Sequence, residues 1–315
     1  MSGKKNQGLL FGIFIILLIL VGINQIVKNK KGERTFKAEL LNVTADQVTK
    51  MSLYTKGENY QEIALVKKGD RWNIEFKGST YAADRDLVQN MLDEITGIKP
   101  DRLVANKKES WSDYDVTDTT GVRVELYGDK KKLAEVYIGR FSYNQTTRKP
   151  TTFVRMGGEK EIYAVEAYLS MTFSRDIKGL RDKSLFRGNR NDLTGITFTY
   201  PADSSFSLSK EKTHWLVDGA PADSATAIQY LNSIAYLIGQ NFRDDFNPNT
   251  FNGNVFQLIL QRNNKPPVEI KAYADSAGMV FNSSENPETY FGDGSANLFK
   301  KVFKGKSYFT PKKTE

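Results

Sequence analysis

Residues 63–76 read IALVKKGDRWNIEF, and residues 193–217 read LTGITFTYPADSSFSLSKEKTHWLV. In the first stretch apolar residues alternate with polar ones on both sides of a Lys-Gly-Asp turn, and the second run carries Trp72. Alternation of this kind predicts half-buried strands, and Gly and Asp between two such runs predict a hairpin. The second stretch has similar strand patterning and leads to Trp215, so two similar sets of antiparallel strands are expected.

An amphipathic helix is predicted after each tryptophan. The apolar positions are Leu87, Val88, Met91, Leu92 and Ile95 after Asp84, and Ala227, Ile228, Leu231, Ile234, Ala235 and Ile238 after Asp223. This spacing places one apolar stripe along a helix, and an Asp before the stripe is a typical N-cap acceptor. We therefore expect Asp84 and Asp223 each to cap a helix.

Further hairpins come after both helices in the same order. Their predicted turns are Gly128–Asp129 and Gly157–Gly158 in the first half, and Asn263–Asn264 and Asn282–Asn286 in the second. Equivalent residues are 143 positions apart at the tryptophans, 139 at the capping aspartates and 132 at the Val136 and Val268 strands. Because the offset falls smoothly, the sequence predicts two copies of one plan that differ by small loop deletions.

The predicted fold class is α+β, with two tandem similar domains of mostly antiparallel sheet and one main covering helix each. The first repeat domain is expected at 46–186 and the second at 192–309, with the basic stretch 174–193 as the boundary. The other expected segments are a short N-terminal tail at 1–8, a transmembrane anchor at 9–27, a basic linker at 28–45 and a C-terminal tail at 310–315.

The anchor prediction rests on Leu9–Val27, LLFGIFIILLILVGINQIV, which carries no charged side chain. At 1.5 Å per residue this helix would span about 28 Å, close to the hydrocarbon thickness of a bilayer. A cleaved signal peptide would need small residues after the apolar run, where the chain has Asn24 and Gln25. A buried core helix would be amphipathic, whereas this segment is apolar all round. We expect an uncleaved, single-pass anchor.

Charge leaves two orientations open. Five basic residues lie after the apolar segment and two precede it, so the positive-inside rule favours a cytoplasmic C-terminal region. Long folded regions are nevertheless often translocated, and Lys4 and Lys5 resemble the start of a signal, so we expect the N-terminus inside and the domains outside. Beyond residue 37 the chain has 38 Lys and Arg against 36 Asp and Glu, so nucleic acid is not an expected partner.

Several of these features resemble a known family. They are the N-terminal apolar segment, the strand–GDRW–strand opening, the Asp-capped helix and LRDKSLF at Leu180–Phe186. They look like the membrane-associated domain-of-unknown-function family 4340 over most of residues 40–190, and more weakly to about 309. In WSDYDV, at Trp111–Val116, family members often place a Gly/Pro turn after the tyrosine, which is missing here.

The resemblance implies a bacterial envelope protein, often encoded near ABC transporters of the gliding-motility type. It implies no catalytic residues. The expected location is the bacterial inner membrane, with the N-terminus in the cytoplasm and the C-terminal domains in the periplasm.

Composition limits the chemistry that the chain can perform. Its 315 residues include no Cys and one His, which excludes disulfides, thiolate metal sites and cysteine nucleophiles. His214 is the one candidate for a Ser–His base. It stands beside Trp215, where the first copy has Arg71 beside Trp72, and this indicates a polar strand face.

Carboxylates supply the remaining candidates. Asp84 and Asp223 could be a pair for glycoside hydrolysis, but helix capping explains each of them better. The clusters Asp113–Asp115 and Asp244–Asp245 lie in loop-like sequence and are expected to be solvated. Gly292–Asp293–Gly294 lacks the third Gly of a dinucleotide-binding loop.

Residues Asp245, Asn247 and Asn249 have the spacing of a calcium loop. Thr250 and Phe256 stand where that loop needs Gly and Glu, so an EF-hand is not expected. Aromatic residues could line a glycan or protein interface, although core packing is the preferred interpretation. They are Tyr137, Phe141, Tyr143, Phe242 and Phe246.

The sequence thus predicts a non-enzymatic, membrane-anchored envelope protein that serves as scaffold or accessory subunit of a membrane complex. The expected partner is an ABC transporter or another envelope complex, with no catalytic, cofactor-binding or metal-binding residues and no cofactor. The alternative is an extracytoplasmic glycan- or solute-binding module with a cleft between the repeats. A third hypothesis is a hydrolase with two acids about 5–10 Å apart.

Overall fold

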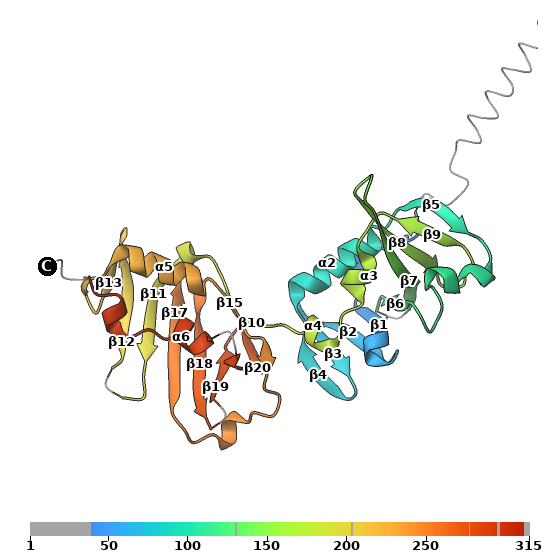
Figure 1. Cartoon of the computed structure of the whole chain (residues 1–315). Helices are drawn as coiled ribbons and strands as arrows, with labels where there is room; N and C mark the ends of the chain where they lie inside the picture. Colours follow the sequence, from blue (N-terminus) through green and yellow to red (C-terminus); the bar gives the residue numbers. More distant parts are fainter. Residues whose placement is uncertain (1–38, 130, 203, 277, 295–296, 312–315) are drawn as a thin grey trace, which may run out of the picture. The chain divides into compact units, whose positions relative to one another are not determined.

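The computed structural model describes residues 39–129, 131–202, 204–276, 278–294 and 297–311 (Figure 1). The chain divides into two compact units. Unit 1 comprises the chain up to Ile63 together with Gln89–Asp176, and unit 2 comprises Ala64–Val88 together with Ile177–Glu315.

The predicted anchor at 9–27 lies outside the described residues, as do the tail at 1–8 and most of the linker at 28–45. Among the helices that the structure describes, none combines the length and the apolar character needed to cross a membrane. The anchor therefore stays a prediction from the sequence.

Nine strands form the first large sheet, in the order β4-β3-β2-β1-β6-β7-β8-β9-β5. They are β1 (Lys50–Tyr54), β2 (Glu62–Lys68), β3 (Arg71–Phe76), β4 (Ser79–Ala82), β5 (Pro100–Ala105), β6 (Val122–Tyr127), β7 (Lys132–Asn144), β8 (Lys149–Met156) and β9 (Ile162–Val165). The helices of this part of the chain are α2 (Arg85–Thr96), α3 (Leu169–Phe173) and α4 (Ile177–Leu180).

Nine strands also form the second large sheet, in the order β14-β13-β12-β11-β17-β18-β19-β20-β16. They are β11 (Leu193–Thr199), β12 (Phe206–Glu211), β13 (His214–Val217), β14 (Ala220–Pro221), β16 (Asn241–Phe242), β17 (Val255–Arg262), β18 (Lys265–Asp275), β19 (Gly278–Ser283) and β20 (Asn286–Gly292). Its helices are α5 (Ser224–Ile234) and α6 (Leu298–Val302), and β10 (Ser184–Arg187) pairs with β15 (Tyr236–Ile238) in a separate two-stranded sheet.

The two large sheets have the same order of strands, and in each a helix comes after the fourth strand. Antiparallel pairing is found in both sheets, for example between β1 and β6 and between β11 and β17. The predicted α+β class with mostly antiparallel sheet is therefore confirmed. Short 3-10 helices occupy Ala45–Gln47, Lys56–Glu58, Lys108–Ser110, Ser112–Tyr114, Arg190–Asp192, Pro248–Thr250 and Lys306–Tyr308.

The predicted hairpin turns are found where the sequence places them. Lys68 pairs with Arg71 across the first turn, and Gly69 there has a φ of 61°, a conformation that glycine adopts at no steric cost. Arg262 pairs with Lys265, and Asn264 takes the left-handed conformation with a φ of 54°. Asparagine tolerates this region better than most residues, so Gly69 and Asn264 both suit the turns in which they lie.

The core of unit 2 lies between one face of the second sheet and the helices α5 and α6. Trp215 is buried in it with 5% exposure, and the fully buried Phe309 lies against Tyr230 with ring centroids 5.2 Å apart. One predicted core position was wrong, because Ile228 is 43% exposed and Tyr230 points inward instead. Tyr230 can be buried because its hydroxyl donates to the Val302 carbonyl at 2.5 Å.

The helix at this place is also shorter than predicted. It ends at Ile234, and the chain continues into β15, so Ile238 lies in a strand rather than on the helical stripe. In α2 the predicted apolar positions Val88, Met91, Leu92 and Ile95 are buried. The helical spacing of apolar residues therefore predicts the buried face of α2 more accurately than that of α5.

Unit 1 has a small separate core where the connection between β5 and β6 packs on the sheet. Arg155 is 3% exposed there, and its guanidinium carbon lies 3.7 Å from the ring centroids of both Trp111 and Tyr137. Its Nε donates to the Val116 carbonyl at 3.0 Å. Gly139 is needed beneath this connection, because an added Cβ would lie 2.0 Å from the Tyr114 carbonyl oxygen. The WSDYDV segment, where the chain departs from the family pattern, thus has a structural role.

Candidate functional site

The segment that contains LRDKSLF is held in unit 2 by backbone hydrogen bonds. The Asp84 amide donates to the Leu180 carbonyl at 2.9 Å, and the Asp182 amide donates to the Ala82 carbonyl at 2.8 Å. Arg181 also forms an isolated β-bridge with Ala83. The segment therefore runs directly beside the end of β4 and the start of α2.

Arg181 anchors this segment through its side chain. The guanidinium donates to both carboxylate oxygens of Asp244, at 2.7 and 2.6 Å, and the arginine is only 5% exposed. Its central carbon lies 4.1 Å from the Tyr81 ring centroid and 3.7 Å from that of Phe242. A planar guanidinium suits both the two-pronged carboxylate contact and the stacking. Asp244 keeps 53% of its side chain exposed, as expected of a solvated carboxylate, but it also binds Arg181, which the sequence analysis did not predict.

Arg187 makes the second ionic contact of the segment. It donates to Asp84 Oδ2 at 2.6 Å and lies 3.1 Å from Asp86 and 3.5 Å from Asp182. Burial alone would raise the pKa of the Asp84 carboxyl. The hydrogen bond from Arg187 and the amide of Leu87 outweigh burial, so this pKa lies below its usual range.

Both predicted helix caps are confirmed. Asp84 Oδ1 accepts hydrogen bonds from the amides of Asp86 and Leu87 at 3.1 Å each. Asp223 Oδ1 accepts one from the Thr226 amide at 2.7 Å. Each carboxylate thus satisfies amides that a helix leaves without an internal partner. The two residues act in capping, each at its own helix.

The one histidine lies on an exposed strand position. His214 pairs with Glu211 across a hairpin, and Arg71 pairs with Lys68 at the matching place in the first sheet. Both His214 and Arg71 are exposed. His214 Nδ1 lies 3.2 Å from the Thr213 hydroxyl. The prediction of a polar strand face is confirmed.

The other polar candidates hold loops in place. Arg243 donates to the two oxygens of Asp245 at 3.0 Å each, and Asn247 Oδ1 accepts from the Asn249 amide. Asp293 accepts from the Phe299 amide at 2.9 Å, near the start of α6. Asp115 ends a 3-10 helix in the left-handed conformation. Searched over the described residues, His, Asp and Glu form no group of three or more suited to a metal ion.

The aromatic candidates divide between core and surface. Tyr137 is 6% exposed beneath Arg155, and Phe242 packs on the core against Phe291 with centroids 5.3 Å apart. Phe246 joins a separate cluster with Phe251, Tyr273 and Tyr290. Phe141 stacks on Tyr168, whereas Tyr143 is 46% exposed. Core packing is confirmed for Tyr137 and Phe242.

Unit 1 contains a dense group of titratable side chains around Glu125. This carboxylate is 7% exposed and accepts hydrogen bonds from Tyr127 at 2.5 Å and from Lys132 at 3.2 Å. The hydrogen bond to Glu125, together with burial, raises the pKa of Tyr127 to about 12. Glu135 accepts from Tyr137 and Lys132 in the same network. These groups satisfy one another, so the network stabilises the sheet face.

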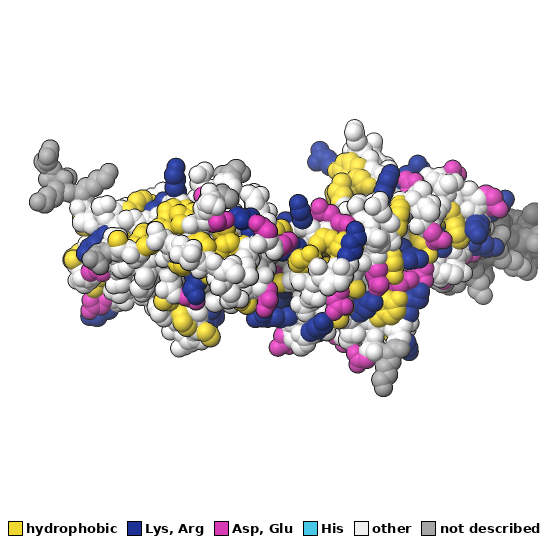
Figure 2. All heavy atoms as spheres, turned by 90° about the horizontal axis from the view of Figure 1, so that it is seen from below, with side chains coloured by type: hydrophobic (Ala, Val, Ile, Leu, Met, Phe, Trp, Pro, Cys, Tyr) yellow, Lys and Arg dark blue, Asp and Glu magenta, His cyan; other side chains and the backbone are white. Residues whose placement is uncertain are grey.

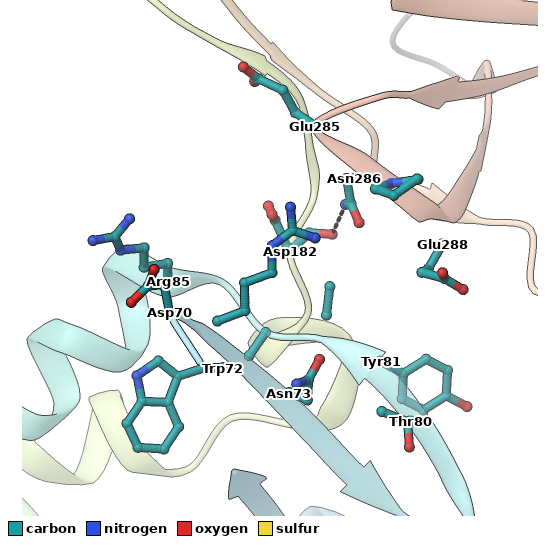
Figure 3. A pocket seen from close by; sticks show the side chains of 14 residues that line it. Asp70, Trp72, Asn73, Thr80, Tyr81, Arg85, Asp182, Glu285, Asn286 and Glu288 are labelled. Carbon is teal, nitrogen blue, oxygen red and sulfur yellow. Dashed lines mark hydrogen bonds between the residues drawn. The ribbon is translucent and has the colours of Figure 1, made fainter. Parts of the chain in front are cut away.

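A cavity of about 520 Å³ opens in unit 2 (Figure 3). Its wall comes from β3, β4, the start of α2, the LRDKSLF segment and the β19–β20 turn. The lining residues are Asp70, Arg71, Trp72, Asn73, Thr80, Tyr81, Ala82, Ala83, Arg85, Asp182, Glu285, Asn286, Pro287 and Glu288. The volume lies in the range of small-molecule sites. The sequence analysis gave a cleft between the repeats as an alternative but named none of these residues as a site, because the wall joins segments more than 200 residues apart in the chain.

Two of the acids in this wall already have basic partners. Asp182 accepts from Ser184 and faces Arg187, and Glu285 accepts from Arg262 at 2.8 Å. Asn286 donates its amide to the Asp182 carbonyl at 3.1 Å, which Figure 3 marks with a dashed line. On the face of the molecule in Figure 2, basic and acidic side chains lie interspersed. This wall would therefore recognise a ligand through individual polar contacts and not through an electrostatic field of one sign.

The comparisons with known proteins identify the family. The model of the domain of unknown function DUF4340 matches residues 76–252, which is more than half of the chain. The chain therefore belongs to the DUF4340 family. No curated protein and no solved structure gives a significant match.

Proposed function

We propose that this protein is a non-enzymatic, membrane-anchored scaffold or accessory subunit of an envelope complex, with an ABC transporter as the expected partner. The observation that carries the proposal is that three carboxylates considered as site candidates have structural roles. Asp84 and Asp223 cap helices, and Asp244 holds the buried Arg181. Carboxylates that stabilise the fold in this way suit a protein whose role is to hold partner proteins in place.

The location belongs to the same proposal. The apolar segment Leu9–Val27 would hold the chain in the bacterial inner membrane, with the domains in the periplasm. The shared strand order of the two large sheets supports two tandem copies, at 46–186 and 192–309. Duplicated cores on one anchor provide two similar surfaces for contact with a membrane complex.

Crosslinking in native membranes tests the partner. Gentle crosslinking and then affinity purification of the full chain should recover a transporter or another membrane subunit. The matched control is the same purification without crosslinker. Recovery of the chain only as a free monomer would contradict the scaffold proposal.

Cysteine labelling tests the location, because the natural chain has no Cys. Thr146→Cys places a thiol at an exposed position between β7 and β8, and Ser2→Cys places one before the anchor. A maleimide that does not cross membranes should label the first variant in spheroplasts and the second only after lysis. The reverse pattern would place the domains in the cytoplasm.

A second candidate function is a solute-binding module, and the 520 Å³ pocket is the observation that favours it. Its polar lining and its volume are those of a small-ligand site. Thermal shift of the full chain against sugars and cell-wall fragments tests this role in general. A flat response across that panel would remove a glycan from consideration.

A further inference from the structure

We propose that the pocket of unit 2 binds a small zwitterion, a free amino acid or short peptide that carries both an ammonium and a carboxylate. The proposal rests on the second candidate function, since it names the ligand class of that pocket. It is independent of the scaffold role, which crosslinking tests.

The charges in the wall restrict what the pocket can hold. Asp182 and Glu285 have arginine partners within the protein. In the part of the chain that the structure describes, no ion pair or side-chain hydrogen bond engages the other four charged groups. They are Asp70, Arg71, Arg85 and Glu288.

These four groups have no net charge, which restricts the ligand. A purely anionic ligand would meet the two carboxylates, and a purely cationic ligand would meet the two guanidinium groups. Like charges brought together at a binding site cost affinity, whereas complementary charges give specificity. A ligand with one group of each sign satisfies both kinds of side chain at once.

The placement of the groups favours the same class. Figure 3 shows Asp70 and Arg85 at one end of the pocket and Glu288 at the other. The end with Glu288 would take the ligand ammonium, and the ligand carboxylate would then pair with Arg85, which lies beside Asp70. The volume of about 520 Å³ accommodates a molecule of dipeptide size.

Contacts within the protein hold the wall in position. The Tyr81 ring is stacked on Arg181, and the Asn286 amide is bound to the Asp182 carbonyl. Trp72, which is 7% exposed, is one of the lining residues. A site that is ordered before the ligand arrives loses less conformational freedom on binding.

Isothermal titration of the full chain in detergent tests the proposal. The probes are alanyl-alanine, its N-acetylated form, its C-terminal amide and sucrose. Alanyl-alanine should bind, and each of the other three should bind about tenfold more weakly or worse, because a charge-assisted hydrogen bond is lost. Arg85→Ala should abolish the preference for the free carboxylate, and Glu288→Gln the preference for the free ammonium.

Both substitutions are at exposed positions, so the fold should persist, and Arg175→Ala is the matched control at an exposed arginine outside the pocket. Equal binding of sucrose or of the blocked peptides would overturn the ligand class while keeping a binding role. If none of the four probes bound, the ligand class would be overturned. The separate thermal-shift panel would then decide whether the pocket has a binding role. Weakening by Arg175→Ala as large as that by Arg85→Ala would also overturn the assignment.

Discussion

The two helix starts in unit 2, at Asp84 and at Asp223, share a backbone framework but use it differently. The Asp84 amide donates to the Leu180 carbonyl at 2.9 Å, and the Asp223 amide donates to the Phe309 carbonyl at 2.8 Å. The residue before each aspartate donates to a tryptophan carbonyl, Ala83 to Trp72 and Ala222 to Trp215, at 3.0 Å in both cases. The same pattern of backbone hydrogen bonds is therefore found at both helix starts.

The start at Asp84 has a further ionic contact from the chain beyond Leu180. After Leu180 the chain continues through Arg181 and Arg187, which bind Asp244 and Asp84. The cap at Asp84 is thus joined to an ionic contact 103 residues away in sequence. The Asp84 carboxylate therefore both caps its helix and binds Arg187, directly after the LRDKSLF segment.

The largest expected effect is at the tryptophans. Trp72→Ala and Trp215→Ala should each destabilise the protein by about 3–5 kcal/mol, because removal of a buried aromatic ring loses apolar burial and leaves a cavity. Urea unfolding monitored by circular dichroism measures both. Similar losses would support equivalent places in the two sheets. A loss below about 1 kcal/mol at one of them would break the equivalence.

Arg181 should have the next largest effect. Arg181→Ala removes a guanidinium that is stacked between two rings and bound to Asp244, with an expected cost of about 2–3 kcal/mol. Arg181→Met keeps much of the side-chain volume and should recover part of that cost. Urea midpoints of both variants measure the effect. If alanine and methionine were equally harmless, the segment would not be anchored here.

Contacts between residues close in sequence were predictable, whereas contacts between distant residues were not. The caps at Asp84 and Asp223 and the turn at Gly69 were predictable, because their partners lie within three residues or in the facing strand. The partner of Asp244 was not, since Arg181 lies 63 residues away and nothing local indicates it. The residues that line the charged pocket were missed for the same reason.

Chemical ambiguity caused the error at Ile228. Ile228 and Tyr230 both fit an amphipathic helix, and hydrophobicity alone favours burial of the isoleucine. The Val302 carbonyl accepts the Tyr230 hydroxyl and so removes the cost of burying it. That carbonyl comes from α6, 72 residues later, so the helix sequence does not contain the deciding information.

The Asp84 series separates capping from ion pairing and should give smaller effects. Asp84→Asn keeps a cap acceptor but loses the charge that binds Arg187, at a cost of about 1–2 kcal/mol. Asp84→Ala loses both contacts and should cost about 1 kcal/mol more. Asp223→Ala, which removes the bond to Thr226, should cost about 1 kcal/mol. Urea unfolding of all three measures the order.

A double-mutant cycle gives the control for this series. Combining Asp84→Asn with Arg187→Met should cost less than the sum of the single changes, because both remove the same interaction. Strict additivity would mean that the 2.6 Å contact contributes nothing measurable to stability.

The smallest effect is the pH dependence of the Asp84 contact. The pKa of Asp84 is lower in the folded protein than its ordinary value of 3.8, so the unfolded chain takes up a proton first as the pH falls. The stability gained from this carboxylate is therefore fully present above about pH 5 and is lost as the pH falls through the folded pKa. The difference in urea midpoint between the natural protein and Asp84→Asn should be constant from about pH 7 to about pH 5 and should shrink below about pH 4. A difference that grew on acidification would mean that burial, rather than Arg187, governs this carboxyl.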